Sequence, residues 1–283
     1  MNSELFIFIF LAVVCNVVNK VLDRYVLRDT SVYAFTWLKQ ILGTILFLPL
    51  IFSNFSVPNS KTALIVILIA GVIWTLVSLL AHTSTKRTEV SIKEPLSQSK
   101  IIWILLIGLF LLNELVTTRK IIGTIIVFIG ICVVLIHPER KLGRLNDSGV
   151  LLTLGLAIIV ALVSILDKFA LGYFNPELYG FLTYLIPAII LTFFFLRRIE
   201  EFKHLWFSHG KMAILTIFFS TANYYFTLKA LSLAEITAVY PLLQLATVFA
   251  VIGGIIFMKE REHTWQKIIG TIIVVIGAIV VKT

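Results

Sequence analysis

A chain of 283 residues with 59% hydrophobic and only 14% charged side chains differs from an ordinary soluble domain, in which about 25% of residues are charged. A water-soluble core cannot bury this much apolar surface, so the composition excludes a soluble globular domain and predicts a membrane protein. The formal net charge of +9 comes from Lys and Arg at the ends of apolar runs, where they meet lipid headgroups. No basic face is interleaved with aromatic residues, so nucleic acid is not an expected partner.

Ten apolar segments follow one another along the chain. They span residues 4–27, 31–53, 62–84, 89–112, 119–137, 148–172, 177–197, 210–231, 235–258 and 264–282. A helix needs about 20 apolar residues to cross a bilayer, so each segment is predicted to be a transmembrane helix. A membrane β-barrel is excluded, because its strands alternate and are about half as long. The first segment has no basic n-region and no cleavage site, so we interpret it as a retained helix and not as a signal peptide.

The second half of the chain repeats the first. The heptapeptide KIIGTII occurs at residues 120–126 and again at residues 267–273. Upstream, at a constant offset of 146, four residues have identical counterparts: Glu89 and Glu235, Pro95 and Pro241, Gln98 and Gln244, and Glu114 and Glu260. Near the start of each half, residues 21–24 (VLDR) resemble residues 165–168 (ILDK). We therefore predict two five-helix repeats, residues 1–140 and 148–283. Because five is an odd number, the second repeat starts from the opposite side of the membrane, as an inverted repeat.

The glycines of the repeated helices are spaced for close packing. Gly123 and Gly130 are two helical turns apart, as are Gly270 and Gly277, so each pair leaves one flat helix face. We expect the two helices to pack closely on each other, and we do not interpret these glycines as a ligand-binding loop.

The first helix contains a group of polar residues. Asn16, Asn19 and Asp23 have the spacing i, i+3 and i+7, which places them on one helix face, and Lys20 is one turn from Asn16. A charged side chain inside the bilayer costs about 2.5–3.5 kcal/mol, so such residues usually face a partner or a wet cavity. We predict that Asn16, Asn19 and Lys20 line a central cavity and that Asp23 is a candidate proton carrier. The alternative is that Lys20 and Asp23 lie at the interface and reach the headgroups.

The fourth helix begins with a polar stretch that contains Lys93, Glu94, Pro95 and Gln98, and it becomes wholly apolar from Ile101. Glu94 and Gln98 are one turn apart and share a helix face. Pro95 frees a backbone carbonyl, which survives in a membrane only against protein or a cavity. We predict a substrate site at this helix break, with Glu94 as a second candidate for proton coupling. The alternative is a polar helix end among the headgroups, in which the proline only kinks the helix.

The corresponding stretch of the ninth helix keeps Pro241 and Gln244 but has Tyr240 in place of the glutamate. The two prolines therefore predict a pair of broken helices, with a charged side in the fourth helix and an aromatic side in the ninth. Trp37 and Tyr184 join Tyr240 as the aromatic residues that lie deep enough in their spans to line a cavity. Other aromatic residues, among them Trp74 and Tyr224, could also line a pocket, but near span ends anchoring at the interface is the commoner role.

Residues that would indicate catalysis are not arranged in a recognisable pattern. Cys15 and Cys132 lie inside apolar runs and are interpreted as buried hydrophobic residues. The five histidines are scattered, and the chain has no phosphate loop, no zinc-ligand spacing and no Ser/His/Asp set. We therefore predict that the protein is not an enzyme and has no metal and no cofactor.

The ends of both repeats resemble the EamA type of the drug/metabolite transporter superfamily. The matching residues are Pro95, Asn113-Glu114 and residues 120–130 (KIIGTIIVFIG), and then Tyr240-Pro241, Lys259-Glu260 and residues 267–277 (KIIGTIIVVIG). The resemblance implies ten helices, with a central cavity formed by helices 1–4 and 6–9 and with helices 5 and 10 outside it. It also implies that both termini are cytoplasmic, whereas the positive charge of the loops after odd-numbered helices favours termini outside the cell.

These patterns together predict an all-α integral membrane protein with ten transmembrane helices in two inverted repeats. We expect a secondary transporter that moves small polar metabolites, amino acids or similar zwitterions, across the plasma (inner) membrane by alternating access. Lys93 and Glu94 together would suit a zwitterion. One alternative is an exporter of cationic or aromatic compounds, and another is a non-transporting membrane subunit or lipid-handling helper. The expected partners are a small-molecule substrate, the lipid bilayer and a coupling proton, and a homodimer is compatible with the sequence.

Overall fold

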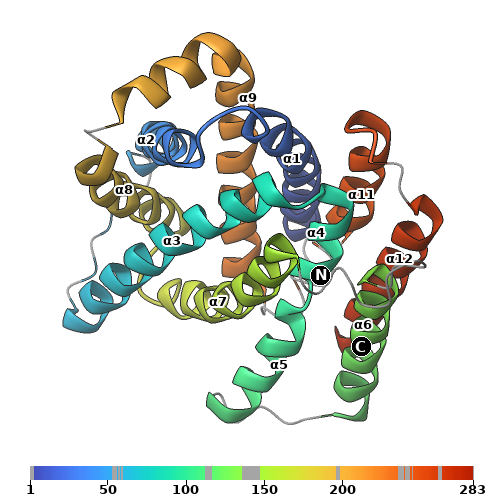
Figure 1. Cartoon of the computed structure of the whole chain (residues 1–283). Coiled ribbons are helices and arrows are strands. Elements are labelled where there is room, and N and C mark those ends of the chain that lie inside the picture. The colour runs from blue at the N-terminus through green and yellow to red at the C-terminus, as the bar shows by residue number, and fades with distance from the viewer. Residues whose placement is uncertain are drawn as a thin grey trace. The chain divides into compact units, whose positions relative to one another are not determined.

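The structure is a computed structural model of the chain. It describes residues 3–52, 56, 58, 60–111, 117–135, 147–195, 198–234, 239, 243, 245–260 and 263–282. Within these ranges every regular element is an α-helix (Figure 1). The helices are α1 (Ser3–Leu27), α2 (Val32–Ile51), α3 (Lys61–Arg87), α4 (Val90–Ser97), α5 (Lys100–Leu111), α6 (Thr118–Leu135), α7 (Ser148–Ala170), α8 (Pro176–Phe195), α9 (Ile199–Leu233), α11 (Leu245–Phe257) and α12 (Thr264–Lys282).

Five of these helices, α1, α2, α3, α7 and α8, are long and apolar enough to cross a membrane. Shorter apolar stretches lie in α6, α11 and α12. Large apolar side chains such as Phe10, Phe128 and Phe193 are exposed along several helices. Lipid tails can cover such side chains, whereas a soluble monomer rarely exposes large contiguous apolar patches. The helices thus have the composition of an integral membrane protein.

The fourth predicted span is broken into α4 and α5. The amide of Gln98 donates to the carbonyl of Pro95 at 3.1 Å, and the amide of Ser99 donates to the carbonyl of Leu96 at 3.0 Å. This three-residue spacing is tighter than that of an α-helix and ends α4. Pro95 itself lies inside α4, so the helix ends a few residues after the proline.

Helix α9 begins at Ile199 and not at residue 210, where the apolar segment starts. The additional turns are polar and carry Glu200 and Glu201 at the positive end of the helix dipole. At His209 the backbone leaves helical geometry, with φ −135° and ψ 15°, and the helix kinks there. The hydropathy of the sequence identified only the part that follows this kink.

The chain divides into two compact units, each of which draws residues from both halves of the sequence. Unit 1 comprises residues 1–82 and 163–236, and unit 2 comprises residues 83–162 and 237–283. In unit 1, α1 packs on α9, and α2 packs on both α8 and α9. One of its cores lies around Phe35, Leu205 and Ile217.

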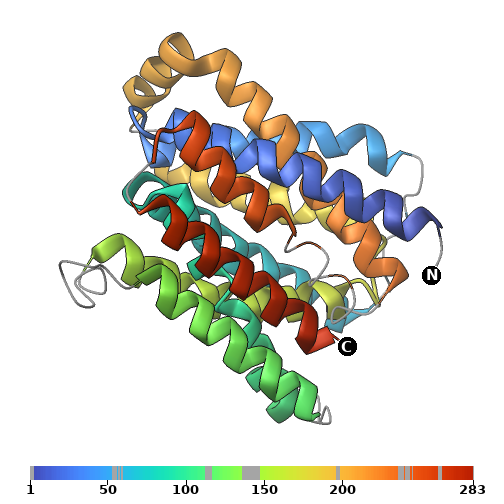
Figure 2. The ribbon, with the colours of Figure 1, turned by 90° about the vertical axis from the view of Figure 1, so that its right-hand side faces the viewer.

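In unit 2, α6 and α12 run side by side, which Figure 2 shows in green and dark red. A Cβ atom added to Gly130 would lie 2.7 Å from the backbone nitrogen of Val274. A Cβ atom added to Gly277 would lie 2.6 Å from the backbone nitrogen of Val127. Only glycine allows the two backbones to come this close, so the close packing predicted from the glycine spacing is confirmed.

Candidate functional site

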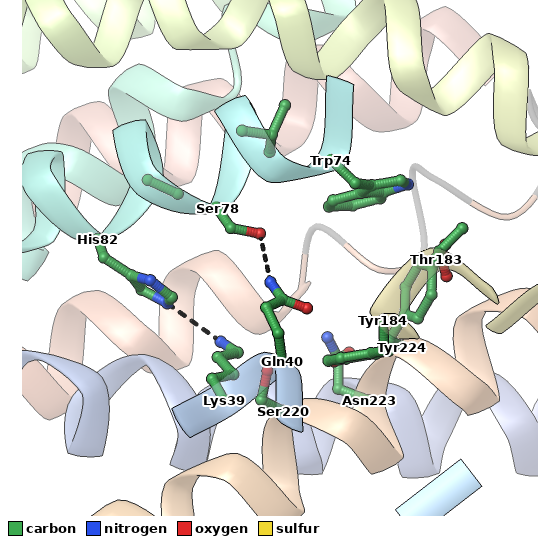
Figure 3. A pocket seen from close by; sticks show the side chains of 12 residues that line it. Lys39, Gln40, Trp74, Ser78, His82, Thr183, Tyr184, Ser220, Asn223 and Tyr224 are labelled. Atoms are coloured by element: carbon green, nitrogen blue, oxygen red, sulfur yellow. Dashed lines mark hydrogen bonds between the residues drawn. The ribbon is translucent and has the colours of Figure 1, made fainter. Parts of the chain in front are cut away.

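A pocket of about 170 Å³ lies inside unit 1, between side chains of α2, α3, α8 and α9 (Figure 3). Most of the polar lining comes from Lys39, Gln40, Ser78, His82 and Asn223. Figure 3 shows Lys39 and His82 at one end of the pocket and the rings of Trp74, Tyr184 and Tyr224 at the other. The pocket is therefore amphiphilic, with a cationic and hydrogen-bonding end opposite an aromatic end.

The polar end is held together by hydrogen bonds between α2 and α3. Nε2 of Gln40 donates to Oγ of Ser78 at 2.8 Å. Nζ of Lys39 lies 3.3 Å from Nε2 of His82. Lys39 is thereby held in place, although its ammonium also lines the open volume. A solute with a carboxylate could bind this ammonium by a charge-assisted hydrogen bond.

The aromatic end is formed by three rings in contact. The Trp74 and Tyr224 ring centroids are 5.2 Å apart, and those of Tyr184 and Tyr224 are 5.9 Å apart. Both pairs have the edge-to-face geometry that aromatic rings prefer. Gly43 on α2 leaves space for Tyr184, because a Cβ atom at that position would overlap the tyrosine ring. This end suits an apolar or aromatic group.

Two aspartates from corresponding places in the two repeats support the two ends of the pocket. Asp23 on α1 lies 3.6 Å from Nζ of Lys39 and accepts a hydrogen bond from Thr216 at 3.0 Å. Asp167 on α7 accepts a hydrogen bond from Nε1 of Trp74 at 3.0 Å and another from Tyr179 at 2.6 Å. Asp23 thus orients the cation of the pocket, and Asp167 orients an aromatic ring.

Asn223 on α9 contributes a buried hydrogen-bond acceptor to the pocket. Its Oδ1 atom is buried and has no hydrogen-bond partner among the described residues. A buried polar atom without a partner is costly and is often found at a functional site. Since Asn223 also lines the pocket, a bound solute could donate a hydrogen bond to this oxygen.

The predicted residues of the first helix lie in unit 1, but they do not line this pocket. Asn19 is buried next to Thr216, whose hydroxyl lies 3.3 Å from the amide oxygen of Asn19. Asn16 and Lys20 are half-buried on α1. Asp23 contributes indirectly, through its ion pair with Lys39.

The two predicted aromatic residues in the described part of the chain lie in different places. Tyr184 lines the pocket described above. Trp37 lines a second pocket of about 360 Å³, together with Tyr33, Leu79 and Arg198. The indole of Trp37 donates to Oγ1 of Thr192 at 2.9 Å. The second pocket is largely apolar, so a polar solute fits the first one better.

The predicted residues of the fourth helix lie in unit 2 and are largely buried. Glu94 is 3% exposed and Gln98 is 2% exposed. Nε2 of Gln98 donates to Thr247 at 2.7 Å, and its Oε1 has no hydrogen-bond partner among the described residues. Nζ of Lys93 donates to Thr85 at 2.5 Å. Tyr240, Pro241 and Gln244, which were predicted for the ninth helix, lie outside the described residues.

The start of α4 is held by a glutamate from the second half of the chain. The carboxylate of Glu260 accepts hydrogen bonds from the amides of Val90 at 2.9 Å and Ser91 at 2.8 Å. Lys267 is fully buried and binds Glu89 at 2.6 Å. A carboxylate at a helix N-terminus satisfies free amides and interacts favourably with the helix dipole. These charged groups in unit 2 therefore stabilise the protein structure.

Sequence reasoning missed Lys39, Gln40, His82 and Asn223. Lys39 was visible as a charge in the middle of the span 31–53, which is itself an indication of a functional site. His82 lies near the end of its span, and it was set aside because the histidines form no metal-binding pattern. Among the described residues, no cluster of His, Cys, Asp or Glu could hold a metal ion.

Comparisons with known proteins agree on the class of the protein. A model of the EamA-like transporter family matches residues 5–136 and again residues 147–283. An uncharacterized transporter of Archaeoglobus fulgidus is 24% identical over 275 residues, which cover 94% of this chain and 93% of that protein. A protein solved by crystallography has the same fold, with a TM-score of 0.67 at 13% identity, over 99% of this chain and 96% of that chain. The family and the apolar helices together indicate a multi-pass membrane transporter. The chain belongs to the EamA-like transporter family.

Proposed function

We propose that the protein is a secondary transporter of small metabolites that carry a carboxylate and an apolar group, with amino acids as the first class to test. The observation that supports this proposal is the amphiphilic pocket of unit 1, where Lys39 lines one end and Trp74, Tyr184 and Tyr224 line the other. Lys39 would bind the carboxylate, and the rings would contact the side chain. The buried oxygen of Asn223 would accept a hydrogen bond from the amino group.

The volume of the pocket limits the size of the solute that it can hold. A cavity of about 150 Å³ holds benzene, so the 170 Å³ of this pocket suit a solute with one ring or a branched aliphatic group. A nucleotide-linked sugar is several times larger. The pocket therefore favours amino acids and small carboxylates over solutes of that size.

We propose that transport occurs across the plasma membrane by alternating access of two inverted five-helix repeats. Lys93, Glu94 and Gln98 would contribute to the solute pathway in unit 2, with Pro95 and the nearby helix break as a hinge. Support comes from the break between α4 and α5 and from the buried polar atoms beside it, because irregular backbone at membrane depth is tolerated where it faces protein or a cavity.

Export of cationic compounds is the second candidate, and the aromatic end of the pocket favours it. Rings such as Trp74 and Tyr224 attract organic cations. However, Lys39 at the other end repels a cation, and no acidic side chain lines the pocket among the described residues. The pocket thus supports carboxylates better. A non-transporting subunit or lipid-handling helper has no specific support in the pocket.

Thermal stabilisation of the purified protein by separate solutes tests the proposal. A ligand that binds only the folded state adds about 2.7 kcal/mol at a concentration 100 times its Kd. We expect a rise of Tm with L-amino acids or monocarboxylates of suitable size, and none with quaternary amines. A rise with quaternary amines alone would contradict the proposal and support the second candidate. Counterflow of the stabilising solute in proteoliposomes then distinguishes transport from binding.

A double variant tests the role of the ammonium. Lys39→Met combined with Asp23→Asn removes both members of the ion pair, so that neither is left buried without the other. We expect carboxylate binding to weaken by about ten-fold or more, because a charge-assisted hydrogen bond contributes roughly 1.5–3 kcal/mol. The control is Lys211→Met, an exposed lysine of α9 in the same unit. Equal binding by the two variants would refute the assignment of the carboxylate to Lys39.

A further inference from the structure

The second pocket of unit 1 combines an apolar wall with a cation at one end. We propose that it binds a glycerophospholipid, with the phosphate at Arg198 and one acyl chain along the apolar wall. The pocket of about 360 Å³ is lined by Tyr33, Trp37, Leu79, Leu191, Phe194 and Arg198. None of these residues lines the pocket that contains Lys39, so the lipid site goes beyond the proposed transport function and does not depend on it.

Three helices supply the apolar wall of this pocket. Leu191 and Phe194 are three residues apart on α8 and share one helix face, while α3 contributes Leu79 and α2 contributes Trp37. Leu191 is 5% exposed and Phe194 is 73% exposed, so the wall runs from the interior of unit 1 to its surface. A cavity of about 150 Å³ holds benzene, so a pocket of more than twice that volume has room for a segment of an acyl chain.

Arg198 presents hydrogen-bond donors at the other end of the pocket. Its guanidinium carbon lies 4.3 Å from the centroid of the Tyr33 ring, and its Nη1 atom lies 3.5 Å from Oε1 of Glu201. The side chain is 44% exposed, so a ligand can reach it. A guanidinium has five N–H donors in a planar fork, and this fork binds a phosphate by two parallel hydrogen bonds. The pair with Glu201 uses only the Nη1 side of the fork.

The acidic residues beside Arg198 have other partners. The second carboxylate oxygen of Glu201 accepts a hydrogen bond from the hydroxyl of Ser31. Glu200 forms an ion pair with Lys203 at 2.7 Å. Arg198 can therefore turn toward a phosphate without leaving Glu201 unpartnered, and Lys203 offsets the charge of Glu200. The charge at this end of the pocket thus suits an anionic headgroup.

The first turns of α9 place Arg198 at the depth of the lipid headgroups. Trp206 and Phe207 are exposed in this segment, together with charged side chains. A helix that exposes aromatic and charged residues together is typical of the membrane interface. The ring of Phe202, from the same segment, packs edge-on against Trp37 with the centroids 5.5 Å apart. This contact fixes the interfacial segment beside the pocket, so the phosphate would lie at headgroup depth and the chain would extend toward the membrane interior.

Three probes distinguish a phospholipid from its parts. Palmitoyl-oleoyl phosphatidylglycerol has the phosphate and the chains, palmitoyl-oleoyl glycerol has the chains alone, and glycerol phosphate has the phosphate alone. Native mass spectrometry of delipidated protein in detergent gives a Kd for each. We expect the phospholipid to bind at least about ten-fold more tightly than either part, because the phosphate contact and chain burial both contribute. Equal binding of glycerol phosphate would assign the site to a soluble anion, and equal binding of palmitoyl-oleoyl glycerol would leave the phosphate without a role. Either result would overturn the inference.

Arg198→Gln tests the contact with the phosphate. Glu201 keeps its hydrogen bond from Ser31 in this variant, so Tm should change little. We expect the Kd for phosphatidylglycerol to rise by about ten-fold, because a charge-assisted hydrogen bond is lost, while palmitoyl-oleoyl glycerol binds as before. The matched control is Lys203→Gln, which removes a cation of the same segment that does not line the pocket and likewise unpairs a glutamate. An equal loss in the two variants would indicate general attraction to a positive surface and would contradict the site.

Leu79→Trp tests the position of the acyl chain. The larger side chain would fill part of the apolar pocket, so the Kd for phosphatidylglycerol should again rise by about ten-fold, because a few methylene groups lose their contacts. The control is Ile65→Trp, at an exposed apolar position toward the other end of α3. An unchanged Kd in folded Leu79→Trp would show that the chain lies elsewhere. Arg198→Gln decides the proposal without any change inside the packed helices, even where Leu79→Trp does not fold.

Discussion

The two compact units use buried polar residues in different ways. In unit 1, Lys39, His82 and Asn223 line an open volume, and the buried Oδ1 of Asn223 has no hydrogen-bond partner among the described residues. In unit 2, the charged groups of Glu260 and Lys267 bind residues at the start of α4. A charged residue in an apolar helix is thus not by itself a sign of a binding site. The distinguishing feature is whether the residue lines an open volume, as Lys39 does, or binds the backbone and side chains of a neighbouring helix end, as Glu260 does.

The largest expected effect is on the stability of unit 2. Gly277→Ala places a Cβ atom 2.6 Å from the backbone nitrogen of Val127, and backbone cannot give way as a side chain can. We expect a loss of about 3 kcal/mol or more, since overpacking costs 1–3 kcal/mol even where side chains can adjust. Thermal unfolding by circular dichroism measures it. The matched control is Gly155→Ala on α7, where the added Cβ would meet no atom of another described element within 4 Å. Similar Tm values for the two variants would show that the glycines do not set the α6–α12 distance.

The second prediction concerns the structural role of charge in unit 2. Glu260→Ala leaves the amides of Val90 and Ser91 without their acceptor, so we expect a loss of about 2 kcal/mol of stability. Hydrogen exchange should increase first at the start of α4. The control is Glu200→Ala, because Glu200 forms an exposed ion pair with Lys203, which should contribute less than about 1 kcal/mol. An unchanged exchange rate at α4 would contradict the capping role.

The third prediction tests unit 1 at a residue that carries no charge. Asn223→Ala removes a buried oxygen that has no hydrogen-bond partner in the described part of the chain, so the folded state should lose little stability. Binding of an amino acid should weaken by about five-fold to ten-fold, because one hydrogen bond contributes roughly 1 kcal/mol. Calorimetric titration of the wild type and the variant with the same amino acid gives the ratio. Unchanged affinity together with unchanged Tm would mean that Asn223 does not contact the solute.

The smallest expected effect on stability is at the helix break of unit 2. Gln98→Leu removes an amide whose Oε1 has no hydrogen-bond partner among the described residues. The lost hydrogen bond to Thr247 is offset, because a buried polar oxygen without a partner is removed as well. We expect stability to change by less than about 1 kcal/mol. Solute counterflow in proteoliposomes should nevertheless fall if Gln98 contributes to the pathway. Normal counterflow at normal stability would remove Gln98 from the proposed pathway and make unit 2 purely structural.

The sequence by itself determined the helical membrane class, most helix positions and the close packing of α6 on α12. These properties depend on local composition and on glycine spacing along one helix. Polarity inside the spans also singled out Asp23 and Gln98 as candidate site residues, and the depth of Tyr184 in its span singled it out as a candidate cavity residue. The helical turns before His209 were missed, because their polar residues lower the hydropathy of that segment.

Only the tertiary structure decided which polar residues share a site. Asp23, Lys39 and His82 come from three different helices, and Asn223 comes from a fourth. No periodicity within a single helix relates their positions. The capping of α4 by Glu260 likewise joins residues that are 170 positions apart in the chain. Such contacts depend on how helix faces pack against one another, and that packing is a property of many distant residues at once.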